Sequence, residues 1–219
     1  MKEEKRLHKD ALKLYAITDR SWLGGRTLYE QVEKALKGGI TMLQLREKNT
    51  EAFADEDAFM REMQAIKELC HAYRIPFIVN DYVELAARLD ADGVHIGQAD
   101  MEIRKARQIL GENKIIGVTA KTTEQAKRAQ AAGADYLGSG AVFGSSTKKN
   151  AKPMEHDLLQ KICESVSIPV VAIGGIDAGN AAQLAGRKIA GIAVVSGIFA
   201  QENIEAAAGQ LREIAEHII

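Results

Sequence analysis

Three polar side chains share one face of a short, otherwise apolar segment, TMLQLREK (41–48). Successive side chains of a β-strand point to opposite faces, so Gln44, Arg46 and Lys48 point the same way. Cations on a buried face need an anionic partner, which is either a protein carboxylate or a substrate phosphate. The planar guanidinium of Arg46 suits a bidentate contact with phosphate or diphosphate. The segment therefore predicts an anion-binding site at the end of a strand.

Two carboxylates follow two neighbouring apolar runs. Asp81 ends PFIVND (76–81), and Asp100 comes shortly after GVHIG (93–97). Neighbouring strands lie about 4.8 Å apart, so the two acids can converge, and they repel unless a cation or a proton lies between them. Magnesium is typically held by one or two carboxylates, substrate phosphates and water. The alternative is that each Asp caps the helix that follows it; the nearby cationic segment favours a metal.

Glycines mark a second anion-binding region, in AIGGID (172–177) and VVSGIF (194–199). Glycine allows the backbone to approach a phosphate closely, and a helix N-terminus attracts one. The loop GSSTKKN (144–150) adds hydroxyls and cations, and we expect it to close over a ligand.

No cluster of cysteines or histidines in the sequence indicates a zinc site. The roles of His95 and Trp22 stay open.

These residues require elements that bring them to one place. Short apolar runs recur eight times, at 13–19, 41–48, 76–81, 93–97, 114–121, 135–142, 169–176 and 191–198. Near-continuous apolar strands are typical of parallel sheets covered on both faces, and segments with helical spacing separate the runs. The pattern predicts an α/β fold, a single (β/α)8 TIM barrel over residues 13–219, with residues 1–12 as an N-terminal arm or helix. Active sites of such barrels lie at the carboxyl ends of the strands, where all the polar residues above fall.

Other organisations and partners are less favoured. A doubly wound open sheet lacks support because no GxGxxG follows the first strand. The net charge of −1 gives no electrostatic case for nucleic acid or an anionic membrane surface. The two cysteines are far apart, which predicts free thiols in a reducing compartment. Without a signal-peptide pattern or an 18-residue apolar run, we expect a cytoplasmic protein.

The motifs resemble those of thiamine phosphate synthases. In order and spacing, the match comprises QLREK, VND, HIGQAD, GVTAKT, GAVFGSSTK, AIGGI and VVSGIF, and it runs from Leu14 to about Ala200. This family joins 4-amino-2-methyl-5-hydroxymethylpyrimidine diphosphate to thiazole phosphate and releases pyrophosphate. The chain departs from the family pattern at Gly144, often Pro, at Ser145, often Thr, and at Lys121, often His, so we assign Lys121 no role.

The resemblance implies roles for individual residues. The pyrimidine diphosphate would be bound by Gln44, Leu45, Arg46, Glu47, Lys48, Asn80, Thr119 and Lys148. The thiazole phosphate would be bound by Ser145, Ser146, Thr147, Gly175, Val195 and Ser196. Asp81 and Asp100 would ligate one Mg²⁺ per subunit, and the catalytic groups would be Arg46, Lys48, Lys148 and Thr119.

The implied mechanism is a dissociative substitution. Cations neutralise the charge of the departing pyrophosphate, and the site holds the two substrates in position to react. The alternative is an isomerase like the thiazole tautomerase, a relative with the same barrel that uses a His for proton transfer. A non-catalytic thiazole- or phosphate-binding regulator is a third hypothesis. The sequence leaves open whether the thiazole carries a carboxylate. It also leaves open whether the chain forms a homodimer, as barrels of this size often do.

Overall fold

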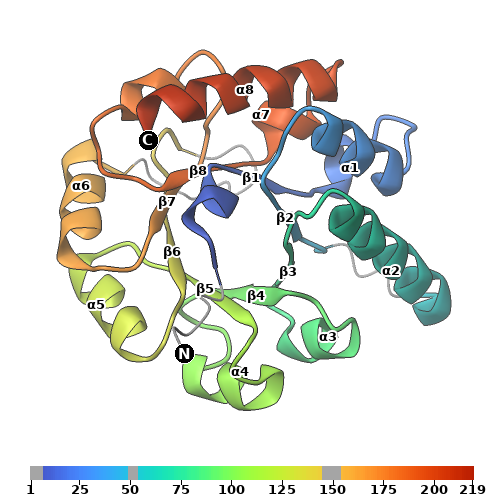
Figure 1. Ribbon diagram of the computed structural model, residues 1–219, viewed down its shortest axis with the longest axis horizontal. Helices are drawn as coiled ribbons and strands as arrows, with labels where there is room; N and C mark the ends of the chain where they lie inside the picture. The colour runs from blue at the N-terminus through green and yellow to red at the C-terminus, as the bar shows by residue number, and fades with distance from the viewer. Residues whose placement is uncertain (1–6, 49–53, 145–153) are drawn as a thin grey trace.

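The computed structural model describes residues 7–48, 54–144 and 154–219. Within these ranges, eight parallel strands close into a barrel in chain order, and β8 pairs with β1 (Figure 1). The strands are β1 (Leu14–Ile17), β2 (Met42–Leu45), β3 (Phe77–Asn80), β4 (Gly93–Ile96), β5 (Ile115–Thr119), β6 (Tyr136–Gly140), β7 (Val170–Ile173) and β8 (Gly191–Val194). Each lies inside one of the eight apolar runs. The predicted (β/α)8 barrel is confirmed, and the β1–β8 pairing excludes an open sheet.

Helices form a ring outside the strands (Figure 1). They are α1 (Leu28–Lys37), α2 (Glu56–Ala72), α3 (Val83–Arg88), α4 (Ile103–Leu110), α5 (Thr123–Ala131), α6 (His156–Ser165), α7 (Ser196–Phe199) and α8 (Ile204–Ile218). Short 3-10 helices are η1 (Lys9–Leu12), η2 (Arg20–Trp22) and η4 (Ala181–Leu184). The connection from β7 to β8 thus carries only the short helix η4, whereas two helices, α7 and α8, follow β8.

Two apolar cores explain why the strands are apolar on both faces. Alternate residues such as Leu43 and Leu45 pack outward under the helices. The other set fills the lumen, where Tyr15 and Tyr136 are fully buried and pack with Leu12 of η1. Period-two alternation therefore decides which strand residues reach the cavity at the mouth and which pack beneath the helices.

The βα connections end at defined helix caps. Thr27 Oγ1 accepts from the backbone N–H of Glu30 at 3.1 Å, and Glu30 Oε2 accepts from that of Thr27 at 2.8 Å. This reciprocal capping box begins α1 and thereby ends the first βα loop, which contributes to the barrel mouth. Among the described helices, none combines the length and apolar character needed to span a bilayer. Cys70 and Cys163 are free thiols, as predicted.

Candidate active site

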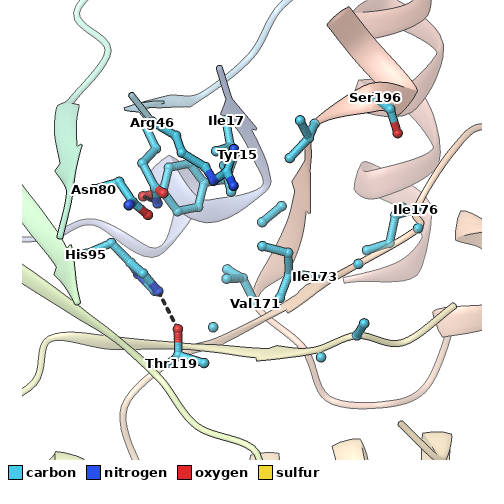
Figure 2. Close-up of a pocket in the computed structure, with 18 of the residues that line it drawn as sticks. Tyr15, Ile17, Arg46, Asn80, His95, Thr119, Val171, Ile173, Ile176 and Ser196 are labelled. Atoms are coloured by element: carbon cyan, nitrogen blue, oxygen red, sulfur yellow. Dashed lines mark hydrogen bonds between the residues drawn. The ribbon is translucent and has the colours of Figure 1, made fainter. Parts of the chain in front are cut away.

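A cavity opens at the carboxyl ends of the strands, and all eight strands or the residues just after them contribute to its wall (Figure 2). Gln44 and Arg46 line it from the β2 side, and Asn80, His95 and Thr119 from the next three strands. Its opposite wall is made by Gly174, Gly175, Val195 and Ser196 after β7 and β8. Seven of the predicted residues thus face one another across a single cavity: Gln44, Arg46, Asn80 and Thr119 on the pyrimidine side, and Gly175, Val195 and Ser196 on the thiazole side.

Residues of QLREK divide between the two faces of β2. Leu45 is 1% exposed and belongs to the outer core. Glu47 is 2% exposed and pairs with Arg20, whose Nη2 also lies 2.6 Å from Glu62 Oε2 of α2. Neither Leu45 nor Glu47 lines the cavity, so their side chains hold the strand end against the helix layer.

Arg46 is aimed by the first βα loop. Its backbone N–H donates to Thr18 Oγ1 at 3.0 Å, and its Nη1 donates to Asp19 Oδ2 at 2.9 Å. The two charged side chains are 16% and 12% exposed, so this ion pair is poorly screened by solvent. A guanidinium has five N–H donors, and one contact with a carboxylate leaves others for an anionic ligand. Asp19, which the sequence analysis did not single out, therefore fixes the direction of Arg46.

Asp81 and Asp100 come together at the rim, as the sequence predicted. Asp81 is hydrogen-bonded to Lys48, whose Nζ lies 2.6 Å from its Oδ2, and also to Asp100 and Asn80. Burial raises the pKa of Asp81, but the hydrogen bond and charge of Lys48 outweigh it, helped by Asp100 and Asn80, and the pKa lies below its ordinary value. The carboxylate therefore stays ionised at neutral pH.

The two acids do not act as helix caps. The N-cap positions of α3 and α4 are Tyr82 and Glu102. Asp81 itself has φ +62°, a left-handed conformation that few residues other than glycine adopt. Asp100 Oδ2 accepts from the backbone N–H of Gly97 at 2.6 Å, which ties it to the end of β4. The helix-cap alternative is thus excluded.

The donor set fits a hard divalent cation. Two carboxylates from neighbouring strand ends supply oxygen ligands, which magnesium prefers. Within the part of the chain that the structure describes, no three His, Cys, Asp or Glu side chains form a metal-binding group. A cation held by Asp81 and Asp100 would thus complete its coordination with water and substrate oxygens, as magnesium does in phosphate-transferring sites.

Glycines after β7 are required by the backbone. Gly174 has φ +105° and Gly175 has φ +65°. A Cβ on Gly174 would lie 2.5 Å from Ala141 Cα, and one on Gly175 would lie 2.8 Å from Phe143 O. Any side chain there would collide with the segment after β6. The bare backbone at this wall can approach an anion closely.

Sequence reasoning missed a chain of hydrogen bonds that crosses the lumen beneath the mouth. Gln44 Nε2 lies 2.6 Å from Tyr15 OH, which lies 2.8 Å from Tyr136 OH. His95 Nδ1 lies 3.0 Å from Tyr136 OH. Its Nε2 lies 3.1 Å from Thr119 Oγ1 (Figure 2). The only available signal was alternation, which places both tyrosines on the lumen face of their strands.

Four of the predicted site residues are not among the residues that the structure describes. Outside the described residues lie Ser145, Ser146, Thr147 and Lys148, together with most of the loop that we expect to close over the ligand.

Two residues to which the sequence assigned no role have clear positions. Lys121 lines the cavity. Trp22 packs, partly buried, against the outer core, and so it is part of the first loop's anchoring.

The fold and the mouth define a class: (β/α)8-barrel enzymes that gather cations and paired carboxylates at the ends of neighbouring strands and carry a glycine-rich wall in the cavity. Residues 14–198 match the model of a family described as thiamine monophosphate synthase. The chain belongs to this family, as its motifs indicated.

Individual relatives agree with this assignment. The chain is 46% identical over 201 residues to the thiamine-phosphate synthase of Ruminiclostridium cellulolyticum, covering 92% of this chain and 94% of that protein. It is 44% identical to that of Fusobacterium nucleatum subsp. nucleatum, covering 89% and 93%. Among solved structures, it resembles a thiamine phosphate pyrophosphorylase from Pyrococcus furiosus with a TM-score of 0.86 and 39% identity, covering 96% and 98%.

Proposed function

We propose that this chain is a thiamine-phosphate synthase. It condenses 4-amino-2-methyl-5-hydroxymethylpyrimidine diphosphate with thiazole phosphate, and it yields thiamine phosphate and pyrophosphate. Family membership over residues 14–198 carries the proposal. The cations Arg46 and Lys48, with the paired carboxylates Asp81 and Asp100 that could hold a metal ion, support it, because a diphosphate leaving group needs positive charge nearby.

In the proposed reaction, the bond between the pyrimidine's methylene carbon and the diphosphate oxygen breaks, and the oxygen keeps both electrons. The electron-rich aminopyrimidine stabilises the methylene cation, and the thiazole nitrogen then forms the new C–N bond. Arg46 and Lys48, with Lys148, neutralise the departing charge, while Thr119 and Gln44 orient the pyrimidine. Gly175, Val195 and Ser196, with Ser145 to Thr147, hold the thiazole phosphate. Catalysis is mainly positioning and electrostatics.

Asp81 and Asp100 are the residues that would hold Mg²⁺, one per subunit, and the ion would supply further positive charge for the diphosphate. Lys48 then has two anionic neighbours, Asp81 and the diphosphate, and its flexible stem lets it serve both. A cytoplasmic location and a homodimer stay predictions from the sequence.

The isomerase alternative is weaker. It requires a proton-transferring His in place of Lys121, which lines the cavity here. His95 also lies in the cavity, but Tyr136 and Thr119 contact its two ring nitrogens.

The test is pyrophosphate release on mixing the protein with both substrates, with and without magnesium. We expect release only when both substrates and the metal are present. Asp100→Asn should abolish most of it and weaken Mg²⁺ binding measured by calorimetry in the presence of pyrophosphate, whereas Asp57→Asn, on the exposed surface of α2, should change neither. Binding or isomerisation of the thiazole without pyrophosphate release would contradict the proposal.

A further inference from the structure

Five side chains form a continuous hydrogen-bonded chain across the lumen, from Gln44 on β2 to Thr119 on β5, through Tyr15, Tyr136 and His95. Gln44, Tyr15, His95 and Thr119 line the substrate cavity, while Tyr15 and Tyr136 are only 1% and 0% exposed. Gln44 and Thr119, which lie three strands apart around the barrel, are thus connected through buried hydroxyls.

The donors and acceptors along the chain can all be satisfied in a single direction that starts from Gln44. Gln44 donates through Nε2 to Tyr15 OH, and in this arrangement Tyr15 donates its own proton to Tyr136. Tyr136 then donates to Nδ1 of His95, which places the proton of a neutral imidazole on Nε2. That N–H donates to Thr119 Oγ1 and leaves the threonine hydroxyl proton for the cavity.

The surroundings keep both tyrosines in place and neutral. Their rings meet edge to face, with centroids 5.9 Å apart and an interplanar angle of 74°. A Cβ on Gly117 would lie 2.1 Å from Tyr136 Cζ, so a glycine in β5 makes room for this ring. Burial raises the pKa of both tyrosines well above the ordinary value. The pair therefore holds hydrogen-bond directions and carries no charge.

We propose that Tyr15 and Tyr136 are positioning residues that fix the amide of Gln44 and the tautomer of His95. Gln44 then offers its Oε1, an acceptor, to the cavity, and Thr119 offers a donor. This pattern complements an aminopyrimidine, which carries an exocyclic amine donor beside ring-nitrogen acceptors. The inference rests on the proposed function, and it adds two tyrosines that set how the pyrimidine is recognised through Gln44 and His95.

The first test uses Tyr15→Phe and Tyr136→Phe, which remove only hydroxyls. Each should raise KM for the pyrimidine diphosphate about five- to tenfold, the worth of one net hydrogen bond, and leave KM for the thiazole phosphate within about twofold. The double variant should lose about as much as either single variant, because one break already releases the chain. Equal losses for both substrates, multiplicative losses in the double variant, or unchanged KM values would overturn the proposal.

Ser139→Ala is the matched control. Ser139 lies on the same strand as Tyr136, is 0% exposed, and donates its hydroxyl to Ala120 O at 2.9 Å on the other face of the strand. This variant loses a buried hydrogen bond outside the chain, so it reports the general cost of such a loss. We expect its KM values to match those of the wild type.

A second test does not depend on turnover. Long-range ¹⁵N–¹H NMR of the wild type, with His95 assigned by its loss in His95→Gln, reads which ring nitrogen carries the proton. A neutral imidazole protonated on Nε2 is expected, and Tyr136→Phe should shift the Nδ1 resonance, whereas Ser139→Ala should not. Protonation on Nδ1 would overturn the proposal. If the wild type releases no pyrophosphate, the proposed function fails, and this spectrum still reports on the hydrogen-bonded chain.

Discussion

Lys48 and Asp81 are each other's partners: Nζ of the lysine lies 2.6 Å from Oδ2 of the aspartate. The family resemblance predicts that the lysine binds the diphosphate, and the sequence predicts that the aspartate binds a metal. Their contact ties the end of β2 to the end of β3, so the two functions are electrostatically linked. The lysine is 47% exposed and the aspartate 23%, which leaves the lysine able to turn toward a ligand.

The first prediction concerns the charge of Lys48. We expect Lys48→Met to lower kcat/KM about 100-fold, the usual cost of losing one group that stabilises developing negative charge. Steady-state pyrophosphate release measures it. Lys105→Met, on the exposed surface of α4, is the control. A Lys48→Met variant with wild-type kcat/KM would contradict the role of the lysine.

The second prediction is the pH dependence of stability. The folded pKa of Asp81 lies below its ordinary 3.8, so its ionised form stabilises the fold above that value, and this stabilisation is lost as the pH falls through the lower folded pKa. Lys48→Met removes the charge that lowers the pKa and leaves the burial that raises it. The variant should therefore lose less stability than the wild type as the pH falls, because its folded state no longer favours the ionised Asp81 to the same extent. Urea unfolding between about pH 6 and pH 3 measures it; superimposable pH profiles would contradict it.

Asp19 provides the third prediction. Asp19→Asn keeps the size of the side chain but removes the charge that holds Arg46, so the guanidinium should lose its fixed direction. We expect kcat/KM to fall about tenfold, because misplacing a substrate-positioning group is costly even when the group is still present. Asp10→Asn, which breaks a more exposed pair with Lys13, is the control and should leave kcat/KM unchanged. An increase in substrate affinity in Asp19→Asn would mean that Asp19 competes with the ligand.

The alternation of strand side chains between the two faces of the sheet made much of the barrel mouth predictable from the sequence. It placed Gln44 and Arg46 on one face, and the end of an apolar run marked Asp81. It could not supply partners from distant segments. The contact between Tyr15 and Tyr136 joins residues 121 positions apart and depends on how β1 and β6 face each other across the closed barrel. The short helix η4 was equally hidden, because packing decides whether a weakly helical segment extends.

Glu47 is a residue for which the sequence motif and the structure indicate different roles. The family resemblance places it at the diphosphate, whereas the structure buries it between Arg20 and the strand end. The fourth prediction is that Glu47→Gln lowers the free energy of unfolding by about 1–3 kcal/mol, because Arg20 loses one of its two carboxylates. KM for the pyrimidine diphosphate should stay within about twofold.

Thermal and urea unfolding, together with KM, separate these outcomes. Glu62→Gln removes the other carboxylate that pairs with Arg20. Because the Glu62 side chain is 30% exposed, this variant should lose less stability than Glu47→Gln. A selective rise in KM with unchanged stability in Glu47→Gln would show that Glu47 contacts the substrate after all.

Gly175 carries the fifth prediction. Gly175→Ala combines a left-handed backbone, φ +65°, with a Cβ 2.8 Å from Phe143 O, so the wall after β7 must shift. We expect a loss of about 1–3 kcal/mol in stability and at least a tenfold rise in KM for the thiazole phosphate. Gly186→Ala is a matched control, because Gly186 has φ +75° but nothing within 4 Å of its Cβ. It should lose about 1 kcal/mol of stability and keep both KM values. Equal KM values in the two variants would mean that this wall does not bind the phosphate.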